Sequence, residues 1–177
     1  LLLKLVHETG YPITNTLMGL GGFPASDAHF IGMLGMHGTY EANMAMHDCD
    51  LMINIGARFD DRVTGRVSGF SPHSKKIHID IDDCSIDKII NVDVGIIGDA
   101  GLVIEALLAE WERRGNKNRK KEISAWWDKI SNWQAIDSLS YEGSDKEIKP
   151  EYALQRLNAL SKDQKPFVST DVGQHQM

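Results

Sequence analysis

The stretch from Asp50 to Gly65 constrains the fold of this chain more than any other part of its sequence. It begins with the apolar run Leu-Met-Ile-Asn-Ile, which stops abruptly at Gly56. A short apolar run that is closed by a glycine is typical of a buried parallel strand leading into a loop. Charged residues then crowd this loop, at Arg58, Asp60, Asp61, Arg62 and, after a short gap, Arg66. Because open α/β sheets bind ligands just beyond the carboxyl ends of their strands, we expect a ligand here.

The sequence around this stretch alternates between helical and strand-like patterns. We expect helices at 1–8, 39–47 and 100–115, one or two helical turns at 85–90, and strands at 11–18, 50–56, 75–82 and 92–97. Loops are expected over 19–38, where glycines are frequent. Such alternation predicts an α/β fold of the Rossmann-like type, a parallel sheet with helices on both faces.

The composition changes after Gly115, where the first domain is expected to end. A helix follows with Trp126, Ile130 and Trp133 on one face, and the mixed charge around it favours packing over stacking on bases. A helix at 150–160 and a strand at 166–172 then restart the pattern. We predict a first domain at 1–115, a linker with one helix at 116–149, and the start of a second α/β domain at 150–177. The helix-like beginning and strand-like end lead us to expect part of a longer polypeptide.

Composition argues against several functional classes. Hydrophobic residues make up 42% of the 177, too many for a disordered chain. The net charge of -6, with both signs mixed, argues against nucleic acid as a partner. Cys49 and Cys84 lack Cys-x-x-Cys spacing, so we expect no metal site and no disulfide, which fits a reducing compartment. No apolar run has membrane-spanning length, and no signal peptide is evident.

Three further features could contact a ligand, and each has a plainer alternative. The glycines of 19–22 follow a strand but lack the full G-x-G-x-x-G fingerprint, so they could be a simple flexible loop. The glycines of 32–38 precede a helix and could offer N–H groups to a phosphate, with His37 either a ligand contact or a packed or merely hydrogen-bonded residue. Asp80 lies 24 positions after Gly56 and could accept bonds from ribose hydroxyls, or could simply end a strand.

Five blocks carry a resemblance to a known family. They are Thr16–Gly21, Leu34–Met46, Asn54–Gly65, His78–Asp82 and Asp171–Met177, in this order. Together they closely resemble the catalytic large subunit of the acetolactate synthase (acetohydroxyacid synthase) family, which depends on thiamine diphosphate. The resemblance runs essentially end to end and is most specific around Met36 and Arg58. It implies that the chain holds most of a central FAD-binding domain and the first helix and strand of a thiamine-diphosphate-binding domain.

The resemblance also assigns roles to individual residues. FAD would be held by Thr16, Leu17, Met18, Gly35, Met36, His37, Gly38, Gly56, Ala57, Arg58, Asp60, Arg62, Val63, Asp80, Ile81, Gly98, Asp99 and Ala100. Thiamine diphosphate would be met by Val172, Gly173, Gln174 and His175. Met36 and Arg62 would also face the substrate channel, and a guanidinium suits the carboxylate of a 2-ketoacid. The activating glutamate and the Mg²⁺ ligands of the family have no counterpart here, so we expect no catalytic and no metal residue. The sequence at 25–28, Ala-Ser-Asp-Ala, differs from the sequence of the family at this place.

The function implied is the decarboxylation of pyruvate on thiamine diphosphate and the joining of the two-carbon unit to pyruvate or 2-ketobutyrate. This reaction belongs to branched-chain amino-acid biosynthesis, and the flavin takes no redox part in it overall. The family implies a homodimer or homotetramer, often with a small regulatory subunit. It also implies the cytoplasm in bacteria, or a plastid or mitochondrion in eukaryotes. The alternatives are another carboligase or decarboxylase, such as glyoxylate carboligase, and a non-catalytic nucleotide-binding module.

Overall fold

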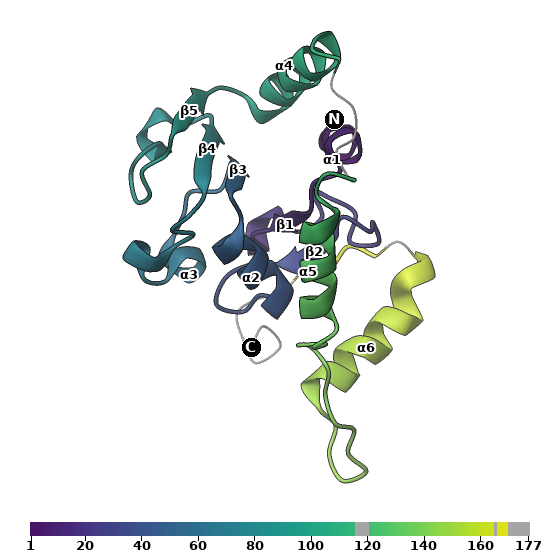
Figure 1. The fold of residues 1–177 in the computed structure, drawn as a ribbon. Coiled ribbons are helices and arrows are strands. Elements are labelled where there is room, and N and C mark those ends of the chain that lie inside the picture. The colour runs from purple at the N-terminus through teal and green to yellow at the C-terminus, as the bar shows by residue number, and fades with distance from the viewer. Residues whose placement is uncertain (116–120, 165, 170–177) are drawn as a thin grey trace. The chain divides into compact units, whose positions relative to one another are not determined.

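All strand pairs in the described part of the chain are parallel, as predicted. The computed structural model describes residues 1–115, 121–164 and 166–169. Strands β1 (Ile13–Asn15) and β2 (Phe30–Met33) form one pair. Strands β3 (Leu51–Ile55), β4 (Lys75–Asp80) and β5 (Val94–Ile97) form a second sheet in that order. Figure 1 shows these strands together with the helices that connect them. The mixed, parallel α/β architecture predicted from the alternating pattern is confirmed.

The residues of the first 138 positions form one compact unit, and those from Leu139 form a second. The first unit contains helices α1 (Leu2–Thr9), α2 (Tyr40–Asp48), α3 (Asp61–Thr64), α4 (Ala100–Arg113) and α5 (Ser124–Gln134). The second contains α6 (Pro150–Ser161), followed by the short 3-10 turn η4 (Lys162–Gln164). The division between the units falls inside the segment predicted as a linker. No helix among the described residues is long and apolar enough to cross a membrane.

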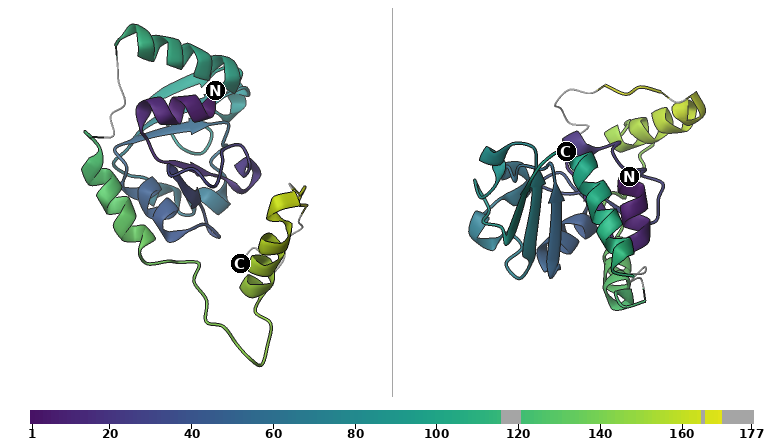
Figure 2. Two further views of the ribbon diagram at one scale, coloured as in Figure 1. Left: turned by 90° about the vertical axis from the view of Figure 1, so that its right-hand side faces the viewer. Right: turned by 90° about the horizontal axis from the view of Figure 1, so that it is seen from above.

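The two faces of the β3–β4–β5 sheet are covered differently. Ile55, Ile79 and Ile96 are aligned across the strands and therefore share one face. Helix α4 packs against β4 on this face, where Ile79 is fully buried (Figure 2). Cover is incomplete, since Ile53 and Val94 on the same face are 38% and 47% exposed.

The opposite face is closed by a small aromatic cluster. Phe59, Phe70 and Ile90 are buried together, and Met46 of α2, Met52 of β3 and Val63 of α3 pack against them. The two phenylalanine rings meet edge to face, with centroids 5.6 Å apart. Helical residues thus cover both faces of this sheet.

A second cluster joins α5 to the β1–β2 pair. Ile130 is fully buried against Ile31 of β2 and Ala45 of α2, and the tryptophans of α5 surround it. The indole N–H of Trp127 donates to the carbonyl oxygen of Gly10 (3.0 Å). The apolar face of this helix is therefore packing surface, as its spacing predicted.

Capping residues explain where the helices begin and end. The Thr39 hydroxyl accepts from the Ala42 N–H at the start of α2, and the Asp99 carboxylate accepts from Gly101 and Leu102 at the start of α4. Helix α1 ends at Gly10, which adopts the left-handed conformation (φ 77°). These three boundaries agree with the sequence expectations.

Several predicted elements differ from the structure. The loop expected over 19–38 contains β2, whose internal Gly32 hides a strand pattern only four residues long. The strand expected at 11–18 is shorter, because Leu17–Gly19 forms a 3-10 turn capped by Thr16. The prediction of one or two helical turns at 85–90 is wrong, because the 3-10 turn in this region spans Asp83–Ser85. The strand expected at 166–172 is absent from residues 166–169, and its remainder lies outside the described residues.

Candidate functional site

The residues predicted to bind FAD all lie at the carboxyl ends of the five strands. Thr16–Met18 follow β1, Gly35–Gly38 follow β2, and Gly56–Val63 follow β3. Asp80 and Ile81 end β4, and Gly98–Ala100 follow β5. Residues spread over 85 positions (16 to 100) are thus found at the carboxyl ends of parallel strands, in the β1–β2 pair and in the β3–β4–β5 sheet. This is where open α/β sheets bind ligands.

The loops that follow β2 and β3 are in direct contact. The Met36 N–H donates to the carbonyl oxygen of Arg62 (2.8 Å). The Arg62 guanidinium lies 3.9 Å from the Met36 sulfur, so the two residues predicted to face the substrate channel are neighbours. A Cβ atom at Gly35 would lie 2.7 Å from the Arg62 carbonyl oxygen, and the φ of Gly35 is +100°. Only glycine permits this approach between the loops.

The loop after β2 is fixed by hydrogen bonds that its main-chain groups make with neighbouring residues. Asn43 of α2 accepts from the Gly35 N–H (2.8 Å) and donates to the Gly35 carbonyl oxygen (2.9 Å). The Gly38 N–H donates to Gly35, and the Thr39 N–H donates to Met33. The N–H groups of residues 35, 36, 38 and 39 are therefore already satisfied. The structure does not support the idea that this glycine loop cradles a phosphate with these groups.

His37, in the same loop, is exposed. The alternative that it is a packed core histidine is therefore wrong. Met36 beside it is 62% exposed. The loop thus presents two side chains to its surroundings while its backbone is held rigidly.

The loop after β3 presents charge and open space. Gly56 has a φ of +69°, and a Cβ atom there would meet no other atom within 4 Å. The Asn54 side chain donates to the carbonyl oxygen of Ala57 and so holds the turn. Arg58 is 78% exposed and lies 3.5 Å from the Asp60 carboxylate, which also caps α3. Because Arg58 and Arg62 are both exposed, the loop offers two guanidinium groups to an anion.

Asp80 is less available than its position at the end of β4 suggested. Its Oδ1 accepts from the Asp82 N–H (2.9 Å), and its Oδ2 lies 3.6 Å from Nε2 of His78. His78 is fully buried, its ring meets Phe59 edge to face at 5.0 Å, and neither ring nitrogen has a hydrogen-bond partner. The Asp80 side chain could still accept a hydroxyl at Oδ2, but Oδ1 is already used.

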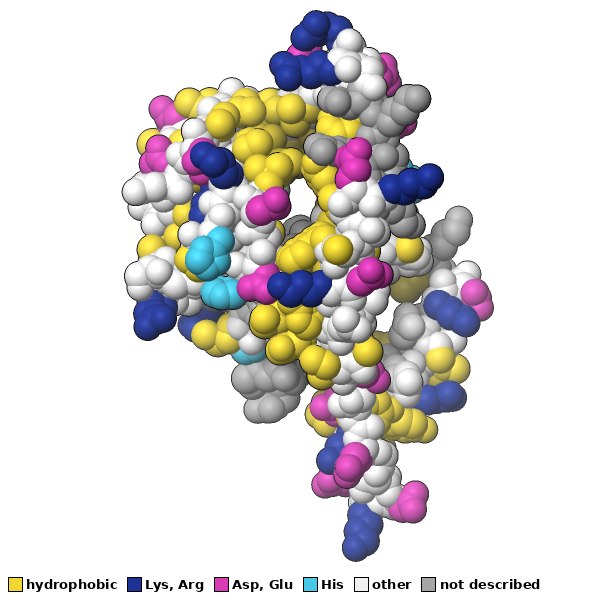
Figure 3. Space-filling model, in the orientation of Figure 1, with side chains coloured by type: hydrophobic (Ala, Val, Ile, Leu, Met, Phe, Trp, Pro, Cys, Tyr) yellow, Lys and Arg dark blue, Asp and Glu magenta, His cyan; other side chains and the backbone are white. Residues whose placement is uncertain are grey.

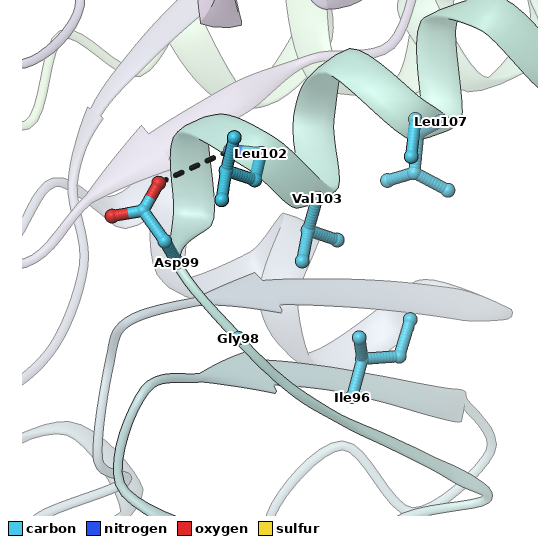
Figure 4. Close-up of a pocket in the computed structure, with 7 residues that line it drawn as sticks. Ile96, Gly98, Asp99, Leu102, Val103 and Leu107 are labelled. Atoms are coloured by element: carbon cyan, nitrogen blue, oxygen red, sulfur yellow. Dashed lines mark hydrogen bonds between the residues drawn. The ribbon is translucent and has the colours of Figure 1, made fainter.

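A shallow apolar cavity of about 370 Å³ lies between the end of β5 and α4. Figure 4 shows Ile96 of the strand and Val103 and Leu107 of the helix facing one another across it. Gly98 and Asp99, predicted to lie near the adenine of FAD, are part of its wall. Since Asp99 is committed to capping α4, the cavity can offer a ligand mainly apolar contact.

Exposed apolar side chains surround the carboxyl ends of the strands. Leu17, Met18 and Ile81 are 51%, 94% and 73% exposed. Figure 3 shows hydrophobic side chains gathered around a hollow in the face drawn there. Exposed apolar surface of this kind marks places where a protein meets a ligand or another surface. Together with Arg58 and Arg62, it suits a ligand that combines flat apolar rings with an anionic group.

Sequence reasoning missed the residues that support these loops. Asn43 and Asn54 are not among the predicted site residues, yet their amide groups hold the two loops in place. The one available signal for Asn43 was an asparagine inside a helix, where it is a poor helix former. Phe59, left-handed at φ 54° and 5% exposed, anchors the second loop from beneath.

The remaining predicted residues give no site in the described structure. Val172, Gly173, Gln174 and His175, predicted to meet thiamine diphosphate, lie outside the described residues. Cys49 and Cys84 are both free thiols. Burial raises the pKa of Cys49, and a hydrogen bond with Asp83 raises the pKa of Cys84. Neither thiol is therefore activated as a nucleophile.

Known proteins resemble this chain along nearly its whole length. Residues 1–107 match the family described as thiamine pyrophosphate enzyme, central domain. The chain is 43% identical to the acetolactate synthase large subunit of Haemophilus influenzae, over 99% of this chain and 30% of that protein. It is 42% identical to the acetolactate synthase isozyme 3 large subunit of Escherichia coli, over 98% of this chain and 30% of that protein. It is 41% identical to acetolactate synthase 1, chloroplastic, of Zea mays, over 98% of this chain and 27% of that protein. The chain thus spans less than a third of the length of these relatives.

Proposed function

Since the chain belongs to the thiamine pyrophosphate enzymes and carries their central domain, we propose that it is the flavin-binding part of an acetolactate synthase large subunit. The observation that carries this proposal is the junction of the loops after β2 and β3. Met36 and Arg62 lie side by side there, at the carboxyl ends of parallel strands. An apolar thioether and an exposed guanidinium suit the edge of a flavin and the carboxylate of a 2-ketoacid.

The side chains at the strand ends have the chemical character that the parts of FAD require. Apolar side chains at Leu17, Met18 and Met36 suit the isoalloxazine rings. Arg58 is proposed to meet the diphosphate, which its exposed guanidinium supports, and the open space above Gly56 would allow the ligand to approach the backbone. Asp80 and the cavity beside Gly98 suit the adenosine end. In this proposal FAD undergoes no net redox change, so these residues bind and position it.

The proposed reaction joins two 2-ketoacids, pyruvate with pyruvate or with 2-ketobutyrate, and releases CO₂. Thiamine diphosphate, when bound, supplies the stabilisation of the carbanion that decarboxylation leaves. The proposed role of the Arg62 side chain is to hold the carboxylate of a ketoacid. The Arg62 carbonyl oxygen meanwhile accepts the Met36 N–H and keeps Met36 in place. Val172, Gly173, Gln174 and His175 are proposed to meet the diphosphate of thiamine, and Mg²⁺ ligands are expected outside these 177 residues.

The proposed partners follow from the relatives. Two of them are named large subunits, which supports a small regulatory subunit as a partner of this protein. We further propose a homodimer or homotetramer. The relatives are bacterial and chloroplastic, so the proposed place of action is the bacterial cytoplasm, or a plastid or mitochondrion.

Acetolactate formation by the full-length protein tests the proposal. The protein is assayed with pyruvate, thiamine diphosphate, Mg²⁺ and FAD, and acetolactate is the expected product. Folded protein that makes no acetolactate would sink the proposal. Glyoxylate as the preferred substrate would identify a glyoxylate carboligase instead. A purified protein without a flavin absorption band, binding NAD or ADP, would favour a nucleotide-binding module.

The role of Arg62 is tested separately. Arg62→Ala should weaken use of the second ketoacid more than it weakens retention of flavin. Arg66→Ala is the matched control, because Arg66 is also exposed but lies beyond α3. Equal losses of ketoacid use and of flavin retention in Arg62→Ala would contradict this division of roles.

A further inference from the structure

His7, Asp27 and His29 form a cluster that the proposed function does not use. Nε2 of His7 lies 2.7 Å from Oδ2 of Asp27, and Nδ1 of His29 lies 2.9 Å from Oδ1 of the same carboxylate. One ligand atom from each of the three side chains lies within 4.8 Å of the others. The ring centroids of the two histidines are 5.2 Å apart. Two imidazoles and one carboxylate therefore converge from different parts of the chain.

The cluster is built on fixed supports. The Asp27 carboxylate accepts the N–H of His29 (2.9 Å), and the turn is closed by the Asp27 N–H to Pro24 (3.1 Å) and the Phe30 N–H to Asp27 (3.0 Å). The carbonyl oxygen of His29 accepts from Ile13 at the start of β1 (2.8 Å). The rings of His29 and of Trp127 on α5 meet in a T-shaped arrangement, with centroids 5.6 Å apart. Backbone and aromatic contacts of this kind hold donor atoms in a defined geometry.

The burial of the cluster leaves one side open. The side chains of Asp27 and His29 are each 16% exposed, whereas that of His7 is 49% exposed. The hydrogen bonds from the His29 N–H and from both imidazoles hold the pKa of Asp27 well below its usual range, so the carboxylate is ionised at neutral pH. Three protein donors with an open side resemble metal sites that complete their coordination with water.

The cluster is separate from the strand ends that form the proposed flavin site. His7 lies in the last turn of α1, just before β1, and His29 directly precedes β2. Both therefore lie at the amino ends of these strands, while the flavin residues lie at the carboxyl ends. A ligand at the cluster would tie the end of α1 to the loop at 24–30 without touching the flavin loops.

We propose that His7, Asp27 and His29 bind a divalent transition-metal ion of the Zn²⁺ class. Two nitrogen donors and one oxygen donor favour such ions over Mg²⁺ or Ca²⁺, which prefer oxygen ligands. Binding requires each histidine to carry its remaining proton on the nitrogen away from the ion, at Nδ1 of His7 and Nε2 of His29. The ion then replaces the two imidazole–carboxylate hydrogen bonds and clamps α1 to the loop before β2.

Zinc titration of the metal-free, full-length protein tests this site. Zn²⁺ is added in the presence of excess Mg²⁺, so that any magnesium site stays filled, and binding is followed by competition with a coloured chelator. The wild type should bind one Zn²⁺ per chain. His7→Ala and Asp27→Asn should each raise the Kd by about 10-fold or more. His73→Ala is the control, because His73 is exposed and lies outside the cluster, and its Kd should equal that of the wild type.

Two outcomes would overturn the proposal. The first is a wild type that binds no Zn²⁺ at micromolar concentrations, which leaves the cluster a hydrogen-bonded triad only. The second is equal binding by the wild type and all three variants. Retained flavin content shows that a variant is folded. Should a variant not fold, the visible spectrum of the Co²⁺-loaded wild type decides: bands of nitrogen-coordinated Co²⁺ support the site, and the spectrum of hydrated Co²⁺ overturns it.

Discussion

The loops after β2 and β3 meet at one point but are built in opposite ways. In the first, residues 34–39, the main-chain N–H groups of residues 35, 36, 38 and 39 have hydrogen-bond partners within the protein, and the side chains of Met36 and His37 are exposed. The second, residues 56–63, carries most of the local charge and is held mainly by Asn54, Asp60 and the buried Phe59. The first loop thus supplies a fixed shape, and the second supplies charge. A site that must hold a large anionic cofactor and also leave room for a substrate needs both properties.

The largest effect is expected from Gly35→Ala, which separates the two loops. The new Cβ atom would lie 2.7 Å from the Arg62 carbonyl oxygen at a φ of +100°. We expect a loss of about 3 kcal/mol in stability from steric overlap and backbone strain, and a loss of flavin. Urea unfolding and flavin absorbance of the full-length protein measure both. Gly143→Ala is the control, since its Cβ atom would meet nothing within 4 Å. A variant as stable as the wild type would show that the close approach is not required.

A smaller effect is expected from Asn43→Ala, which frees the first loop alone. The change removes the bonds to both the N–H and the carbonyl oxygen of Gly35. Because the partly buried N–H loses its partner, we expect a cost of about 2 kcal/mol. Asn132→Ala, at an exposed position of α5, should change the stability little. The same urea unfolding applies, and equal values for the two variants would argue that α2 does not hold the loop.

Arg58→Ala should alter the charge of the second loop without altering its structure. Its ion pair with Asp60 is exposed, so we expect a change in stability of under about 0.5 kcal/mol. The Kd for FAD should rise about 10-fold, the equivalent of one charge-assisted hydrogen bond. Flavin fluorescence during titration of the apoprotein measures the Kd, with Arg66→Ala as the control. Loss of stability without loss of FAD affinity would reverse the roles assigned to the two loops.

The smallest effect is expected from Asp48→Asn, which removes an ion pair between α5 and α2, the helix that follows the first loop. Lys129 of α5 lies 2.7 Å from Asp48 at the end of α2, and this hydrogen bond lowers the pKa of Asp48. A lowered pKa stabilises the folded state above the ordinary carboxyl pKa of about 4, and this stabilisation is lost as pH falls from that value through the lower pKa of the folded state. Asp48→Asn should cost under about 1 kcal/mol at pH 7 and less than that near pH 3. Thermal unfolding at the two pH values tests this, with Asp145→Asn as the exposed control. An unchanged difference at low pH would contradict it.

Much of the fold could be predicted because local signals mark its elements. Thr39, Asp99 and Gly10 are residue types that commonly cap helices, and each does so here. The alternating isoleucines of β4 predict a strand. Strand β2 could not be predicted, since four residues with a glycine among them carry no usable period. The four-residue α3 is likewise too short for periodicity and depends on its cap, Asp60.

The site could be predicted only in part. The five blocks that carry the family resemblance are not needed to expect a ligand beyond the strand ends, because the charges after β3 indicated that place directly. The satisfied N–H groups around Gly35 could not be foreseen, because the Gly35 N–H donates to Asn43, eight residues away, and the Met36 N–H donates to Arg62 in the other loop. The meeting of His7 with Asp27, 20 positions apart, likewise depends on how α1 packs and not on any motif.

The partly covered face of the β3–β4–β5 sheet has a practical consequence for producing this protein. Ile53 and Val94 are exposed there, and β3 and β5 each have an edge that pairs with no other strand among the described residues. Unpaired edges next to apolar surface invite strands from other molecules to add, which is the first step of aggregation. Residues 1–138 expressed alone should therefore be prone to precipitate. A lysine at position 94 would be the first substitution to try, since a charge there discourages intermolecular pairing.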